Sequence, residues 1–416
     1  MKLKFFMVLL ISFLLGCQKQ NISGEKENIV LNFKSWRVED SSRMDYINSF
    51  FTKKYPYISI KYNPVKSVDY DESLDNEIKM GLSSDIVLLR SYDKGYRIYN
   101  KGVLLELNKD IVKLKEYPQT AKNAWTTQSG IQYGLPIAGV LHGIYFRKSV
   151  FEQYNLEPPK TWDEFIDLCE FLYKKGITPI SQGTVSEWTL YEVLFSGLGP
   201  NFYGGEETRQ ELLKKEIRIT DKKFVKTLNT LVELKKYFPL NNKDLDYNGM
   251  LENFKNKDSA MFIGGSWEIS IFKEMGVFDD IGYFAPPVEN LGDNLQYNFH
   301  VDMGVGINKN SENLEEALLY VNWMATDEFA QLFMNELPGF FSFTPGIYSL
   351  DNELSKKMYS YLHGSDKTVR TLWEGFSAQE PSGNSLMSTA LKKLYNNEVS
   401  VLEALDYVNS GLSWYY

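Results

Sequence analysis

Cysteine is almost absent from this chain of 416 residues, which has only two, at positions 17 and 169. Cys169 falls on the apolar side of a predicted helix and has no partner there, so we predict a buried free thiol and no intrachain disulfide. A chain without disulfides must be held together by its hydrophobic core. The 43% of hydrophobic residues in the sequence can supply that core.

Excess positive charge and catalytic motifs are also lacking. The net charge is -9 at neutral pH, whereas nucleic acid binding requires clustered Lys and Arg. We therefore expect no nucleic acid partner, and the acidic balance also argues against a polyanionic ligand. No HExxH, P-loop, nucleophile-elbow or CxxC motif is present, so metal, nucleotide and redox chemistry have little support. We predict no metal, no cofactor and no enzymatic activity.

Long apolar runs are confined to the start of the chain. Lysines at positions 2 and 4 precede an apolar run over residues 5–15, which is too short for a lasting transmembrane helix and predicts a targeting segment over residues 1–16. Its end, Leu14-Leu15-Gly16-Cys17, resembles the bacterial lipobox. The resemblance implies that Cys17 carries a diacylglyceryl group and anchors the protein to a membrane. An ordinary secretory signal that contains a cysteine is the alternative.

The part of the chain that follows is long enough for two domains. Residues 17–27 are polar and predict a flexible tether. The remaining ~400 residues exceed the size at which single cores stop growing, so two lobes are expected. Aromatic residues make up 15% of the chain, more than a core usually requires. Their amphipathic rings suit clefts that grip ligands with both apolar and hydroxylated faces.

The first third alternates strands and helices. Strands are predicted over residues 29–33, 57–62 and 85–89, with helical apolar stripes between them. This β-α-β-α-β order predicts a parallel sheet with right-handed crossovers. Ligands bind beyond the carboxyl ends of such strands, so the loops over residues 35–37 and 90–93 should face one cleft.

A second unit begins after an interrupted strand over residues 132–146, which contains Pro136 and Gly139. We place a crossing between lobes there. Thr161 and Glu164 predict a capping box at the start of the next helix. The region from there to about residue 284 is mostly helical.

Four stretches together resemble one family, the bacterial extracellular solute-binding proteins of sugar importers, in the group that includes maltose-binding protein. They are SSDIVLL with GVLLELN, the run YGLPIAGVLHGIYFRKSVFEQYNLEPPKTWDEF, AMFIGGSWEI, and MGVGINKNSENLEEALLYVNWMATDEFAQLF. Each motif alone is moderately specific for the family, and their order along the chain is strong evidence for it. The chain departs from the family pattern in the pocket loops LLRSYDKGY and NELPGFFSF, so the resemblance speaks more for the family than for a ligand.

The resemblance implies an α/β, two-lobed periplasmic-binding-protein fold of type II, each lobe a mainly parallel sheet flanked by helices. Lobe one would comprise residues 28–137 and 303–343, and lobe two residues 140–299 and 344–416. Hinge strands would lie near residues 136–140, 300–303 and 342–346, where they absorb the backbone rotation as the lobes close.

The implied function is capture of a sugar, most simply an oligosaccharide, for delivery to the permease subunits and ATPase of an ABC importer. We expect a monomer that faces the extracellular side or the periplasm. Trp267, after Gly264-Gly265-Ser266, matches the position where the family stacks sugars; a core tryptophan is the alternative.

Further candidates come from the loops beside the expected cleft and hinges, where aromatic platforms and polar rims suit a sugar. For Asp85 the alternative interpretation is that it braces a loop. For His142 and His300 the alternative is a structural role. Arg37 and Asp93 are expected to lie opposite each other and share one sugar. The full predicted set is Trp36, Arg37, Asp85, Tyr92, Asp93, His142, Glu187, Trp188, Trp267, His300, Asp302, Phe340, Phe341 and Trp373.

Three other functions remain open from sequence alone. A surface glycoside hydrolase would need two carboxylates about 5 to 10 Å apart across the scissile bond. The same scaffold could hold a polyamine, a phosphate ester or an iron complex, which need sites rich in carboxylates, Arg or Tyr. A receptor or adhesin lipoprotein would bind without any importer.

Overall fold

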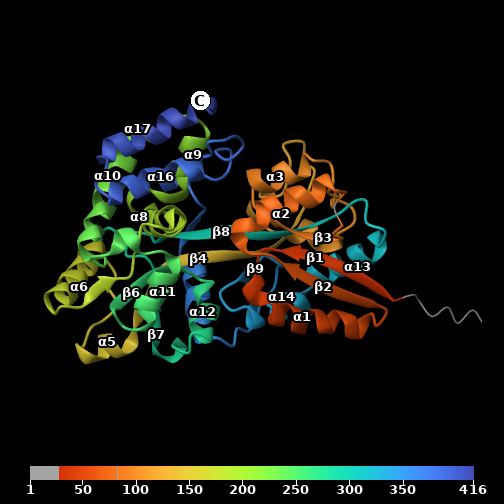
Figure 1. Ribbon diagram of the computed structural model, residues 1–416, viewed down its shortest axis with the longest axis horizontal. Helices are drawn as coiled ribbons and strands as arrows, with labels where there is room; N and C mark the ends of the chain where they lie inside the picture. The colour runs from red at the N-terminus through yellow and green to blue at the C-terminus, as the bar shows by residue number, and fades with distance from the viewer. Residues whose placement is uncertain (1–27, 82) are drawn as a thin grey trace, which may run out of the picture.

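The computed structural model describes residues 28–81 and 83–416 (Figure 1). The predicted targeting segment, Cys17 and the tether lie outside the described residues. Among the residues described, no helix is long and apolar enough to span a bilayer.

The first third forms the predicted β-α-β-α-β unit. β1 (Ile29–Ser35) pairs in parallel with β2 (Ile58–Pro64) on one side and with β3 (Ile86–Arg90) on the other. α1 (Ser41–Lys54) and α2 (Ser67–Lys79) make the crossovers. The first four residues of β3 are all buried, because helices cover both faces of a parallel sheet. The expected order and direction are confirmed, and β1 and β2 each run two residues past the predicted ends.

Two long strands carry the sheet from one body of the molecule into the other, as Figure 1 shows at its centre. β8 (Gln296–Ile307) runs antiparallel to β3 and to β4 (Leu135–Arg147). The far half of β4 then pairs with β6 (Ser259–Gly265) and β7 (Ile281–Phe284). The strand order is β2-β1-β3-β8-β4-β6-β5.

The pairing is therefore parallel at the outer strands and antiparallel at the long ones. β5 (Thr178–Ile180) pairs in parallel with β6, and β10 (Asp366–Thr368) with β8. A strand that crosses between two bodies and another that returns must run in opposite directions, which explains the antiparallel centre.

β4 changes register with β8 at Pro136, Ala138 and Gly139, where β9 (Phe341–Ser342) also pairs with it. A Cβ on Gly139 would lie 2.5 Å from the Phe299 ring, so this close approach requires glycine. Three separate parts of the chain thus meet at one point.

The buried residues divide into clusters that match the two bodies of Figure 1. One cluster takes its members from residues 31–140 and 301–343, plus Trp373; we call this body the first lobe. Two further clusters, from residues 141–412, form the second lobe. Cys169 is fully buried in the second lobe, as predicted.

Helices flank the sheet in both lobes. The predicted capping box is present: Thr161 Oγ1 accepts from Glu164 N at 3.4 Å, and Glu164 Oε2 accepts from Thr161 N at 3.2 Å. In the first lobe the remaining α-helices are α3 (Asp93–Tyr99), α4 (Gln119–Asn123), α13 (Leu314–Met324) and α14 (Asp327–Glu336). In the second they are α5 (Lys148–Gln153), α6 (Trp162–Lys174), α7 (Ser196–Leu198), α8 (Pro200–Tyr203), α9 (Gly205–Leu213), α10 (Lys222–Val232), α11 (Tyr247–Lys255), α12 (Glu268–Glu274), α15 (Glu353–His363), α16 (Gly383–Tyr395) and α17 (Val401–Gly411), with a π-helix, η3 (Thr189–Phe195).

Candidate functional site

The loops after β1 and β3 lie at the same edge of the sheet, as the strand order predicts. The Trp36 side chain is 5% exposed. Its ring meets the edge of Tyr70 at a centroid distance of 5.3 Å, and the Arg90 guanidinium lies 4.7 Å from its centroid. The Arg37 guanidinium lies 4.7 Å from the centroid of Phe340. One face of both aromatic rings is therefore covered by a cation.

The loop after β3 also reaches β8 and the C-terminal segment. Ser91 Oγ lies 3.3 Å from His300 Nε2 on β8, and Ser91 O accepts from Trp373 Nε1 at 3.3 Å. The Trp373 ring meets the edge of His300 at 5.2 Å. Asp93 Oδ2 accepts from Ser377 N at 3.0 Å. These contacts join the two lobes on the side of α3.

Charged groups surround this junction. Arg370 Nη1 forms an ion pair with Glu192 on η3 at 2.8 Å, and its guanidinium lies 4.9 Å from the Trp373 ring. Lys94 lies 5.4 Å from the same ring. Burial raises the pKa of Asp302, against the opposing effect of Arg370 and other nearby cations. Burial likewise raises the pKa of Asp93 to about 6.

The second lobe contributes an aromatic cluster, which we define as Trp267, Trp188, Tyr247 and the adjoining Glu268. Trp267 caps the start of α12 and is only partly buried. A Cβ on Gly265 would lie 2.1 Å from the Trp267 ring, so the glycine lets the indole fold back over the end of β6. The Trp188 ring lies 5.0 Å from that of Tyr247.

Glu268 is the buried carboxyl of this cluster. It is 1% exposed and accepts from Tyr247 Oη at 2.7 Å. Burial raises its pKa to about 8, although the bond from Tyr247 and the charge of Arg37 act in the opposite direction. Burial therefore favours the protonated form of the Glu268 carboxyl, and the charge of Arg37 in the other lobe acts on this group.

Both predicted histidines are core residues. His142 and His300 are at most 1% exposed, and burial lowers the pKa of His142 to about 3 and that of His300 as well. Each ring supports an indole, His142 at 5.4 Å from Trp267 and His300 at 5.2 Å from Trp373. The two side chains are neutral supports behind the candidate platforms.

Other members of the predicted set lie away from the junction. Asp85 sits at the amino end of β3, where it accepts from Asn32 N at 2.7 Å and from the Ser311 hydroxyl. These contacts favour the bracing role for Asp85, because the two ends of a strand face opposite edges of the sheet.

Phe341 packs into a second-lobe core and stacks on Tyr359 at 5.8 Å, so a ligand contact for it stays a prediction. Phe340 is 1% exposed beneath Arg37. Glu187 pairs with Lys392 of α16 at 2.9 Å. Tyr92 is buried in the first-lobe cluster, with a φ of 56°.

The sharing of one sugar by Arg37 and Asp93 stays a prediction. Arg37 bonds Asp40 at 2.7 Å and Glu39 at 2.8 Å. Sequence reasoning also missed several polar residues at the junction. Glu268 follows Trp267 directly and could have been found from that adjacency, whereas the sequence gives no signal for Glu192. The missed residues are Arg90, Lys94, Glu192, Tyr247, Glu268 and Arg370.

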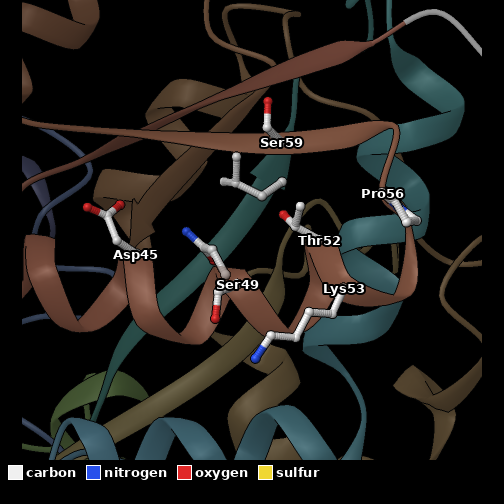
Figure 2. Close-up of a pocket in the computed structure, with 8 residues that line it drawn as sticks. Asp45, Ser49, Thr52, Lys53, Pro56 and Ser59 are labelled. Carbon is white, nitrogen blue, oxygen red and sulfur yellow. The ribbon is translucent and has the colours of Figure 1, made fainter.

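A separate groove of about 510 Å³ lies on the first lobe between α1 and β2 (Figure 2). Asp45, Ser49, Thr52 and Lys53 line it from α1, and Ser59 from β2. It contains no aromatic ring and none of the predicted residues, so it is not the candidate site. Within residues 28–81 and 83–416, no group of three His, Cys, Asp or Glu side chains is placed to hold a metal ion.

Comparison with known proteins gives one family. The model of the bacterial extracellular solute-binding proteins matches residues 35–331. A multiple sugar-binding protein of Streptococcus mutans is 25% identical over 326 residues, which cover 75% of this chain and 75% of that protein. An uncharacterized ABC transporter extracellular-binding protein of Pyrococcus horikoshii is 30% identical over 224 residues, 52% of this chain and 51% of that protein.

Solved structures share the fold. A chitin oligosaccharide binding protein gives a TM-score of 0.77 at 22% identity and covers 92% of this chain and 98% of its own. RafE of Streptococcus pneumoniae, solved in complex with raffinose, gives 0.76 at 20% identity and covers 93% and 99%. At these identities the likeness shows the fold, which is the α/β, two-lobed, type II periplasmic-binding-protein fold that the sequence resemblance implied.

Proposed function

Because this chain belongs to the bacterial extracellular solute-binding proteins, we propose that it captures a sugar between its lobes and delivers it to an ABC importer. The family is a class of binding proteins and not of enzymes. Relatives named for sugar binding, among them the multiple sugar-binding protein of Streptococcus mutans, support a saccharide as the ligand, and we expect an oligosaccharide.

The observation that carries this proposal is the aromatic cluster of the second lobe. Trp267 and Trp188 are both partly exposed, and an indole face is the surface on which the C-H patches of a sugar ring stack. Polar groups that bind hydroxyls lie beside and across from them, including Asp302, Asp93 and Arg37. Trp36, Tyr92, Phe340 and Trp373 complete the proposed walls, with His142, His300 and Glu187 in supporting roles.

Closure of the lobes is proposed to rotate the chain where β4, β8 and β9 meet. The proposed lobes keep the predicted boundaries: residues 28–137 and 303–343 for one, and 140–299 and 344–416 for the other. The core clusters support this division, since the cluster of the first lobe draws on both of its segments. The hinges fall near residues 136–140, 300–303 and 342–346.

The membrane arrangement is part of the same proposal. Cys17 anchors the protein by lipid to the outer face of the cell membrane, and residues 17–27 tether the lobes to it. Permease subunits, with their ATPase behind them, are the expected protein partners of a monomer.

Thermal melting with a saccharide panel tests the proposal. A fragment from residue 18 onward is melted with mono- and oligosaccharides, polyamines and phosphate esters. A ligand at a hundred times its Kd adds about 2.7 kcal/mol to the stability of the state that binds it. We expect a saccharide to raise the midpoint, and Trp267→Ala to weaken its binding about tenfold or more.

Trp414→Ala is the matched control, because this partly buried indole lies near the C-terminus and donates to Pro381 O at 3.1 Å. It should bind the saccharide as the unaltered protein does. A shift produced by polyamines or phosphate esters alone would overturn the sugar proposal and leave the family intact.

A further inference from the structure

Resting on the proposed function, we propose that Arg370 and Asp302 select an uncharged sugar. The guanidinium of Arg370 donates to one hydroxyl, and the carboxylate of Asp302 accepts from a neighbouring hydroxyl of the same ring. Sugars that carry a carboxylate, phosphate or ammonium group at this place are rejected.

The strand pairing places the two residues at one junction. β10 runs parallel to β8, with Thr368 opposite Asn298, so Arg370 follows two residues further along the same direction, beside His300. His300 and Asp302 lie two residues apart on β8, and the charge of Arg370 acts on both of them. This part of β8 meets the C-terminal segment, because the Trp373 ring contacts His300 at 5.2 Å.

Arg370 holds an unused donor there. Its side chain is 5% exposed and fixed by the ion pair of Nη1 with Glu192 at 2.8 Å. Its Nε is buried and has no hydrogen-bond partner among the residues that the structure describes. A buried N-H without an acceptor is costly, so a ligand that supplies an oxygen gains from binding here.

Asp302 holds the complementary acceptor. In the described part of the chain its carboxylate makes no hydrogen bond or ion pair, and the residue remains partly exposed. The nearest lobe-one cations are already engaged, since Arg90 bonds Asp71 at 3.1 Å and Arg37 bonds Asp40 at 2.7 Å. Asp302 is thus free to receive a proton donor from a ligand.

Only a neutral hydroxylated ligand satisfies both groups without a penalty. A hydroxyl can donate to Asp302 and accept from Arg370. A carboxylate or phosphate that approaches Arg370 also meets the charges of Asp302 and Glu192. An ammonium that approaches Asp302 meets Arg370 and, nearby, Arg90 and Arg37. Mixed charge therefore rejects ions of either sign.

Calorimetric titration with matched ligand pairs tests the selection. The pairs are galactotriose with trigalacturonate, and chitotriose with its deacetylated, cationic form. In each pair we expect the neutral member to bind the protein at least about tenfold more tightly. Asp302→Asn should reduce this preference over trigalacturonate by about tenfold, because the amide no longer repels the carboxylate.

Two further variants separate selection from folding. Arg370→Lys keeps the positive charge and removes the Nε donor, so it should weaken neutral sugars and keep the melting midpoint close to that of the unaltered protein. Asp366→Asn, an exposed carboxylate of β10, should leave both affinity and preference unchanged.

The outcomes distinguish the two proposals. If the charged members bind the unaltered protein as tightly as the neutral ones, or if Asp302→Asn leaves the preference unchanged, the selection by this pair is overturned while sugar capture stands. If no saccharide binds in either these titrations or the melting panel, the proposed function fails, and the selection fails with it.

Discussion

The aromatic rings of the two sides of the junction are used differently. On the first lobe and the C-terminal segment, cations cover the rings: Arg90 lies over Trp36, and Arg370 and Lys94 lie over Trp373. In the second-lobe cluster, no cation of the described residues lies over Trp267 or Trp188, and their ring partners are His142, edge to face, and Tyr247, tilted. A covered indole is a structural part of its lobe, whereas an uncovered one can stack on a ligand. The second lobe is thus expected to hold the sugar ring, and the first to contribute charged rims on closure.

The largest expected effect separates stability from affinity. Trp36→Ala removes an indole that is 5% exposed and should lower the free energy of unfolding by about 3–5 kcal/mol. Trp267→Ala removes a partly exposed indole and should cost less stability but more ligand affinity. Urea unfolding and calorimetric titration of both variants measure the two quantities. If both variants lost the same stability and the same ligand affinity, the distinction between covered and uncovered rings would be wrong.

The next effect is a pH dependence of the stability, and it arises from a residue of the second lobe. The pKa of Glu268 is raised to about 8 from an unfolded value of about 4.3, so the folded state keeps a proton that the unfolded chain releases. The stability from this group is complete below about pH 4 and declines by about 1.4 kcal/mol per pH unit until about pH 8. Glu268→Gln removes this slope.

Urea unfolding at pH 5 and pH 8 checks the slope, because the difference between the unaltered protein and Glu268→Gln cancels the titration of other groups. Glu353→Gln is the control, since the Glu353 side chain is 82% exposed, and it should show the slope of the unaltered protein. A slope that persists in Glu268→Gln would mean that another group carries it.

The smallest expected effect concerns the cation that covers Trp36 in the first lobe. Arg90→Lys replaces the planar guanidinium over Trp36 by an ammonium, which stacks less well. We expect a loss of about 0.5–1 kcal/mol in the free energy of unfolding and little change in sugar affinity. A large loss of affinity without a loss of stability would show instead that the guanidinium contacts the ligand.

What the sequence could predict followed from local signals. The β-α-β-α-β unit and the capping box depend on patterns within a few residues, and both are confirmed by the structure. Trp267 was singled out by the glycines before it, and it lies between the end of β6 and the start of α12. These features need no knowledge of distant partners.

What could not be predicted depends on pairing between distant segments. The ion pair of Arg370 with Glu192 forms only because β10 returns to β8 beside η3. The sequence left two roles open for Asp85, and only the pairing of its carboxyl with Asn32 and Ser311 favours the bracing one. Phe340 and Phe341 adjoin in sequence but pack in different clusters, Phe340 beneath Arg37 and Phe341 against Tyr359, which no local pattern predicts.

The pairing of β4, β8 and β9 near Gly139 also affects how the chain folds during its synthesis. β3 pairs with β8, and the first-lobe cluster includes residues 301–343. A domain usually folds as soon as its own stretch of chain has been synthesised. In this protein β1, β2 and β3 cannot complete their sheet until β8 has been synthesised, which happens after most of the second lobe. A nascent chain that ends before β8 therefore has an unfinished first sheet and lacks a complete first lobe.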